Sequence, residues 1–165
     1  MHERLLQYIR SYSTIPLSQS DIEMLKSIFV PKKLRKRQYF LQEGEVCKYN
    51  AFIVKGAMRQ YSVDNKGVER IVELFLENWW AGDLESLLRS TPSIYFVDAW
   101  EETNVLLYSR KGFDALQKIP AITDLSRRMT DQHTFDWVTP QTFNSSNNFH
   151  INVSLFFHAT LHEAT

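Results

Sequence analysis

The spacing of the glycines is the sequence feature that most limits how this chain can fold. Four of the five, Gly44, Gly56, Gly67 and Gly82, follow one another at intervals of 12, 11 and 15 residues. The short segments between them are rich in β-branched and aromatic residues, which favour strands. Turn signals at such intervals are typical of an antiparallel sandwich or barrel, and not of strands alternating with long helices.

Six strands are expected from these patterns. They are Tyr39–Leu41, Ala51–Val54, Met58–Val63, Ile71–Leu76, Tyr95–Trp100 and Val105–Tyr108. The segment Asp64–Gly67 between the third and fourth has the composition of a tight hairpin turn. The sequence therefore predicts an antiparallel double-stranded β-roll, of the jelly-roll or cupin type, over about residues 33–108.

Helices are expected on both sides of the roll, which makes the predicted fold class α+β. Two N-terminal helices cover about residues 3–10 and 18–29, with Ser18 placed to cap the second and Pro31 to end it. After the roll, Ser109 is placed to cap a short helix, and Pro120 to open a longer one that runs to about residue 135.

The helix that begins at Pro120 carries an apolar stripe of Ile122, Leu125 and Met129. The spacing of these residues suits a seam between helices, and charges of both signs flank it, so we predict a homodimer interface here. The alternative is that the stripe packs back onto its own roll.

Composition changes abruptly near Thr130. All 19 Lys and Arg residues precede this point with 16 of the 19 acids, so residues 1–129 carry a formal charge of +3 and the last 36 residues carry −3. We therefore expect a roll with flanking helices over 1–129. Residues 130–165 are expected to be an atypical tail that completes the long helix and continues as a loop or a disordered segment.

Several functional classes are disfavoured by what the sequence lacks. The single cysteine, Cys47, forms no internal disulfide, and no apolar run reaches the ~18 residues of a membrane helix. The N-terminus shows no apolar signal-peptide core, so a cytoplasmic location is expected. No histidine lies between Glu3 and Gln132, and neither Ser86 nor Ser93 has a neighbouring base. We therefore expect no enzyme activity, metal or cofactor, and no membrane partner.

Two further features allow both a functional and a structural interpretation. The run Lys32–Arg37 places five cations in six positions, which suits contact with nucleic acid, but it has no interleaved aromatic residues. We favour a solvated edge strand that lysines protect from pairing. The pair Trp79–Trp80 can line a ligand cavity, and the alternative that we favour is core packing.

The order of these signals resembles the cyclic-nucleotide-binding sensor domain of the Crp/Fnr family of bacterial transcription regulators. The matching segments are Phe40–Glu45, Phe52–Arg59, Asp64–Gly67 and Gly82–Leu84, followed by the Pro120 helix. The resemblance implies a β-roll and a long helix that pairs two subunits and leads into a DNA-reading helix-turn-helix. That module is not visible, because residues 130–165 contain no Lys or Arg. A lost DNA-binding domain and an altered reading frame are both open explanations.

The resemblance also implies a phosphate-binding cassette, a short helix whose opening N–H groups hold a cyclic phosphate beside an arginine. The cassette residues are Gly82, Asp83, Leu84, Glu85 and Ser86, where Asp83 replaces the glutamate of the family. Ser93 stands where the family has its arginine, with Tyr95 after it, and Arg59 and Arg89 are the remaining candidates for the charge.

Because serine cannot replace the arginine–phosphate contact, we expect a ligand-sensing regulatory domain whose small ligand is not cyclic AMP. The alternative is a β-roll dimerisation or interaction module without a small ligand.

Overall fold

The computed structural model describes residues 1–136, with side chains described as far as residue 129. The expectation for the tail beyond the long helix lies outside the described residues. The elements in chain order are α1 (His2–Tyr12), α2 (Gln19–Ile28), β1 (Val30–Leu34), β2 (Tyr39–Leu41), β3 (Tyr49–Lys55), β4 (Met58–Val63), β5 (Glu69–Phe75), β6 (Trp80–Ala81), α3 (Leu84–Arg89), β7 (Phe96–Ala99), β8 (Thr103–Ser109), α4 (Arg110–Leu116) and α5 (Pro120–Asp136).

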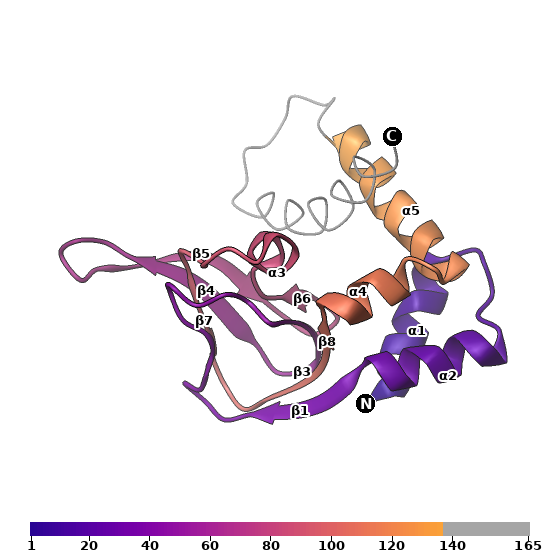
Figure 1. The fold of residues 1–165 in the computed structure, drawn as a ribbon, viewed down its shortest axis with the longest axis horizontal. Coiled ribbons are helices and arrows are strands. Elements are labelled where there is room, and N and C mark those ends of the chain that lie inside the picture. The colour runs from indigo at the N-terminus through magenta and orange to yellow at the C-terminus, as the bar shows by residue number, and fades with distance from the viewer. Residues whose placement is uncertain (137–165) are drawn as a thin grey trace.

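The strands form two four-stranded sheets whose pairings are all antiparallel. Sheet A has the order β1-β8-β3-β6, and sheet B has the order β2-β7-β4-β5. Figure 1 shows α1, α2, α4 and α5 gathered at one end of the molecule, while the β4–β5 hairpin extends from the other end. The predicted α+β class and antiparallel roll are confirmed.

Local sequence signals fix the beginnings of the helices. The Ser18 side chain accepts a hydrogen bond from the N–H of Asp21, and the Asp21 carboxylate accepts one from the N–H of Ser18, which completes a capping box. The hydroxyl of Ser18 also donates to the Asp21 carboxylate at 2.6 Å, and this bond, together with the one from the N–H of Ser18, lowers the pKa of Asp21. Ser109 caps α4 in the same way by accepting from the N–H of Gly112.

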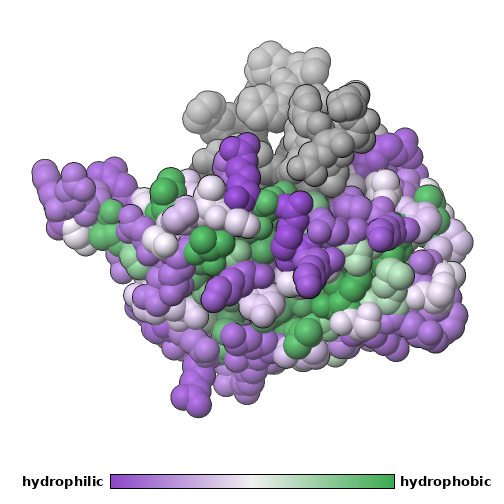
Figure 2. Space-filling model, viewed as in Figure 1, coloured by the Kyte–Doolittle hydropathy of each residue, from purple (hydrophilic) through white to green (hydrophobic). Residues whose placement is uncertain are grey.

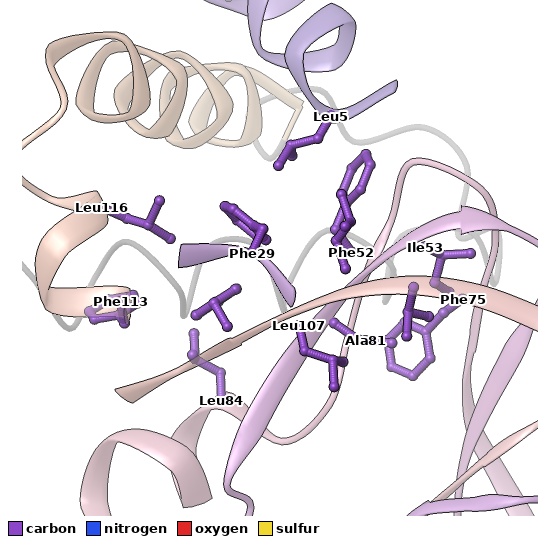
Figure 3. Packing of buried hydrophobic residues seen from close by; sticks show 14 of the residues in the cluster. Leu5, Phe29, Phe52, Ile53, Phe75, Ala81, Leu84, Leu107, Phe113 and Leu116 are labelled. Atoms are coloured by element: carbon purple, nitrogen blue, oxygen red, sulfur yellow. The ribbon is translucent and has the colours of Figure 1, made fainter. Parts of the chain in front are cut away.

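The core occupies two spaces, one between the sheets and one between sheet A and the helices. Figure 3 shows Phe52 of β3 lying towards Leu5 of α1, whereas the next residue, Ile53, lies beside Phe75 of sheet B. This is the alternation expected of a strand that is buried on both faces.

Trp80 belongs to the helix side of this core. Its ring centroid lies 5.0 Å from that of Phe52, 5.8 Å from that of Tyr108 and 6.0 Å from that of Phe29. The favoured interpretation of Trp80 as a packing residue therefore agrees with the structure, and the side chain does not fill the space between the sheets.

Helix α5 packs against α1 through the stripe predicted for the dimer. Ile122 is 4% exposed and Leu125 is 2% exposed within a single chain, and the hydroxyl of Tyr8 donates to the sulfur of Met129 at 3.7 Å. Within one chain, Ile122 and Leu125 are covered by the chain's own residues, whereas Met129 is only partly buried. A homodimer interface that uses this stripe stays a prediction.

Asp124 joins α5 to the loop that follows α1. Its buried carboxylate accepts hydrogen bonds from the N–H and the hydroxyl of Thr14, at 2.8 and 3.0 Å, and from the hydroxyl of Ser13. Arg127 and Arg128 contact the same carboxylate at 3.1 and 3.0 Å. Together these donors hold the pKa of Asp124 well below its usual range.

The surface of the molecule carries both hydrophobic and hydrophilic residues. Figure 2 shows hydrophobic patches among hydrophilic residues on the face that it presents. Strand β5 lies at the edge of sheet B and exposes Ile71, Val72 and Leu74, whereas the edge strand β1 exposes Lys32 and Lys33. None of the helices in the described part of the chain is long and apolar enough to cross a bilayer.

Candidate functional site

The predicted cassette begins at a backbone position that only glycine fills without strain. Gly82 follows β6 with a φ of +133°, and a Cβ atom added there would lie 2.6 Å from Oδ1 of Asn50. Asn50 is itself buried and donates to the hydroxyl of Tyr108 at 2.9 Å. The close approach of Gly82 to this fixed side chain sets the direction in which α3 leaves sheet A.

Asp83 caps α3 and also reaches across to the loop that follows the helix. Its Oδ1 accepts from the N–H of Ser86 at 3.0 Å, and its Oδ2 accepts from the hydroxyl of Ser93 at 2.7 Å. Ser93 is 2% exposed, and its oxygen also accepts from the N–H of Tyr95 at 3.1 Å. Asp83 and Ser93 therefore satisfy each other at the position where the resemblance implies a phosphate.

A second set of bonds ties the cassette to the turn after β2. The N–H of Cys47 donates to Oγ of Ser86 at 2.9 Å, and that hydroxyl donates to the carbonyl of Thr91. The backbones of Ser93 and Gly44 are joined at 2.7 Å. Burial raises the pKa of the Cys47 thiol to about 11, so this side chain stays neutral at physiological pH.

Neither of the two candidate arginines hydrogen-bonds to Asp83, Ser86 or Ser93. Arg89 is exposed and pairs with Glu85 on the same helix at 3.2 Å. Arg59 forms two hydrogen bonds with Asp98, at 2.9 and 3.0 Å, and a third with Glu69 at 2.7 Å. These acidic partners raise the pKa of Arg59.

The position of Arg59 in β4 explains why its side chain pairs with Asp98 and Glu69 and not with the cassette. Its neighbours Met58 and Gln60 share a face of sheet B with the core residues Phe75 and Val97, opposite which they lie in the register. Because successive side chains in a strand alternate, Arg59 and Asp98 lie on the other face, away from sheet A. The expectation that Arg59 supplies charge to the cassette is therefore corrected.

The assembled site is a closed loop whose helix is capped by an acidic residue. The structure joins Gly82, Asp83, Ser86, Ser93 and Tyr95 into one hydrogen-bonded unit, with Leu84 buried beneath it. Among the described side chains, no Lys or Arg hydrogen-bonds to Asp83, Ser86 or Ser93. A carboxylate that occupies the start of α3 repels a phosphate at this position.

Sequence reasoning missed two buried polar residues, Asn50 on the helix side of sheet A and Gln60 on the inner face of sheet B. Both are 4% exposed, Asn50 in β3 and Gln60 in β4. A polar residue at an inward position is the signal that could have found them, but it requires knowing which face of the strand is inward.

Comparison with known proteins places the fold in a family. The sequence profile of the cyclic nucleotide-binding domain matches residues 31–119, which is more than half of the chain. Among curated proteins, no sequence matches.

Solved structures resemble the chain in fold at low sequence identity. The regulatory subunit of a cAMP-independent protein kinase A from Trypanosoma cruzi, bound to guanosine, has a TM-score of 0.60 at 18% identity, over 93% of this chain and 49% of that one. The sensor domain of the transcriptional regulator DNR from Pseudomonas aeruginosa has a TM-score of 0.62 at 17% identity, over 87% and 95%. The catabolite activator protein of Thermus thermophilus has a TM-score of 0.57 at 15% identity, over 89% and 85%.

The chain thus spans about half of the length of the kinase subunit and nearly all of the isolated sensor domain. The matched profile covers the roll from β1 to the end of α4, which includes the cassette and both sheets. The chain therefore belongs to the cyclic nucleotide-binding domain family.

Proposed function

We propose that this domain is the ligand-sensing regulatory part of a Crp/Fnr-type transcription regulator, acting as a cytoplasmic homodimer. In this proposal residues 1–129 form the sensor unit, and its small ligand is held without a cyclic phosphate. The similarity to the DNR sensor domain and to a catabolite activator protein supports the regulatory role. A sensor of this kind needs no catalytic group, so we propose no enzyme activity.

The bond between Ser93 and Asp83 is the observation that carries the choice of ligand. Serine at this position donates to the carboxylate at 2.7 Å, where an arginine would present a cation to a phosphate. The cassette thereby keeps its loop closed with its own residues. The kinase subunit bound to guanosine supports the idea that this fold accepts a nucleoside, which lacks the phosphate.

Thermal-shift measurements and calorimetry with cyclic AMP and guanosine test this proposal. We expect cyclic AMP to leave the melting temperature of the wild type unchanged, whereas a true ligand at a hundredfold excess over its Kd stabilises the fold by about 2.7 kcal/mol. A micromolar or tighter Kd for cyclic AMP would contradict the proposal.

The Ser93→Arg variant tests whether the serine at this position is the reason that cyclic AMP is not bound. We expect it to gain affinity for cyclic AMP by at least about tenfold, because a charge-assisted bond to phosphate replaces the serine–aspartate pair. Ile94→Arg is the matched control, since Ile94 is the next residue and is 65% exposed, so it adds the same charge outside the cassette. Equal gains in cyclic AMP affinity in both variants would show that an added positive charge raises the affinity whether or not it stands in the cassette.

A module without a small ligand is the second candidate. The exposed Ile71, Val72 and Leu74 on the edge strand β5 favour it, because contiguous apolar side chains on an edge mark contact surfaces. Failure of every nucleotide and nucleoside in the thermal screen would favour this candidate.

A further inference from the structure

The basic run at the start of the roll is divided by the end of strand β1. Lys32 and Lys33 lie within this strand at the edge of sheet A, where exposed lysines discourage pairing with another chain. Arg35, Lys36 and Arg37 follow the strand and are also exposed, so protection of the edge does not explain them. Figure 1 shows β1 leading away from α2, which places these three residues, the basic turn, at the end of the roll remote from the helices.

Hydrogen bonds fix the backbone of the basic turn. The N–H of Gln38 donates to the carbonyl of Arg35 at 3.0 Å, and the N–H of Arg35 donates to Oε1 of Gln38 at 2.9 Å. Arg37 has a left-handed conformation with a φ of +66°, and its N–H donates to the carbonyl of Ala99 at 2.7 Å. The three cations are therefore presented from a defined backbone that is joined to β7, which lowers the entropy lost when a partner binds.

An exposed indole lies beside the basic turn. Trp100 is 46% exposed, and the guanidinium of Arg37 lies 5.9 Å from its ring centroid, within the range of a cation–π contact. The guanidinium of Arg59 lies over the same ring at 5.4 Å. These contacts help to order Arg37 and take up space that a stacked base would need, so they favour contact with phosphates over contact with bases.

The neighbouring strands add positive charge to this end of the roll. Lys33 and Lys55 flank Asn104 of β8 from its two sides in the register, and both lysines are exposed. Lys33 pairs with Glu102 at 2.8 Å, and Glu101 is the other acid of the β7–β8 turn. None of the ion pairs among the described residues includes Lys55 or a residue of the basic turn. Cations therefore outnumber acids here.

We infer that the basic turn, together with Lys55, is a surface that contacts the phosphate backbone of double-stranded DNA. Duplex DNA is a dense and regular array of negative charge, and guanidinium groups form paired hydrogen bonds with phosphate oxygens. The basic turn itself contains no apolar side chain, which disfavours a membrane surface or the apolar core of a protein interface as its partner. The inference goes beyond the proposed sensor function and does not depend on the ligand of that sensor.

Fluorescence anisotropy of the full chain with a labelled duplex of arbitrary sequence tests this inference. Each phosphate contact contributes about −0.9 to the slope of the logarithm of the binding constant against the logarithm of the salt concentration. Contacts by the basic turn and Lys55 thus predict a slope of roughly −3.6 for the wild type, and an affinity that does not depend on the base sequence.

The triple variant Arg35→Gln/Lys36→Gln/Arg37→Asn removes the charges and retains the turn, because asparagine tolerates the left-handed conformation at the third position. We expect this variant to keep the melting temperature of the wild type and to lose at least about tenfold in affinity for the duplex at low salt. Its salt slope should fall to roughly −0.9, the value for a single remaining contact.

The triple variant Lys26→Gln/Lys111→Gln/Lys118→Gln is the matched control. These lysines are exposed on α2, on α4 and directly after α4, and their removal changes the net charge by the same amount. We expect this control to bind the duplex as the wild type does, with an unchanged salt slope.

Equal losses of affinity in the two triple variants would overturn the inference, because positive charge anywhere on the surface would then attract the duplex. A wild type that does not bind the duplex at low salt would also overturn it. So would tighter binding to polyglutamate or to phosphatidylserine vesicles than to the duplex at equal charge concentration, which would indicate an acidic protein or a membrane. Failure of the sensor function is seen separately, in the thermal screen with small ligands.

Discussion

At the scale of the residue, the role of Arg59 follows from the face of sheet B on which its side chain lies. It lies between Asp98 and Glu69, and its guanidinium stands 4.2 Å from the ring centroid of Tyr61 and 5.4 Å from that of Trp100. An arginine that contacts two carboxylates and two aromatic rings has a structural role in sheet B. Its charge is neutralised where it stands, so a ligand in the roll does not draw on it.

Removing this guanidinium should destabilise the fold strongly. Arg59→Met leaves Asp98, whose side chain is 4% exposed, without its two hydrogen bonds, and breaking a buried pair in this way costs about 3–5 kcal/mol. Urea denaturation of the variant measures the loss.

The double variant Arg59→Met/Asp98→Leu is the control for this prediction. It removes both buried charges, so we expect most of the stability to return. A double variant as unstable as the sum of the two single variants would show that the pair does not act as a unit.

At the scale of the element, two turns differ in why they require glycine. Gly56, between β3 and β4, has a φ of +99°, and an added Cβ would lie 2.7 Å from the carbonyl oxygen of Glu102. Gly44, after β2, has a φ of +84°, but nothing lies within 4 Å of the added atom. The first turn is limited by backbone conformation and by contact with the β7–β8 turn, and the second by conformation alone.

These two glycines give a matched pair of alanine substitutions. Gly44→Ala should cost about 1–2 kcal/mol, the penalty of a left-handed conformation for a residue with a Cβ. Gly56→Ala adds a clash with backbone that cannot move independently, so we expect a further 1–3 kcal/mol or so. Thermal denaturation compares them, and equal losses would argue against the close approach at Gly56.

The same elements show what sequence patterns can and cannot predict. The strands around the glycines, the helix caps at Ser18 and Ser109 and the opening of α5 at Pro120 are predictable, because each depends on local chemistry. Strand β6 has only two residues and forms through its pairing with β3, so the sequence has no periodic pattern that predicts it. The pairing of Arg59 with Asp98 and the burial of Gln60 depend on strand register, which local patterns do not contain.

At the scale of the whole molecule, the helices form one cap over sheet A. The side chain of Arg4 in α1 donates to Asn78 beside β6 at 2.8 Å, and His2 lies 2.7 Å from the carbonyl of Phe29. Asp124 joins the loop after α1 to α5.

This arrangement changes the expected effect of a charge at Leu125. In an interface between two copies, Leu125→Glu would give a folded monomer. Because Leu125 is 2% exposed within one chain, the substitution instead puts a carboxylate into the core between α5 and α1. A lost leucine alone costs about 2–5 kcal/mol, and the buried charge adds to it, so we expect the melting temperature to fall by roughly 10 °C or more.

Thr123→Glu is the control for Leu125→Glu, since Thr123 is exposed on the first turns of the same helix and an acid there favours the helix start. It should keep the melting temperature of the wild type. Light scattering on all three proteins separates stability from assembly. The homodimer and its interface stay predictions. A Leu125→Glu protein as stable as the wild type that converts a dimer into monomers would return this stripe to the interface, because only an exposed leucine accepts a charge without loss of stability.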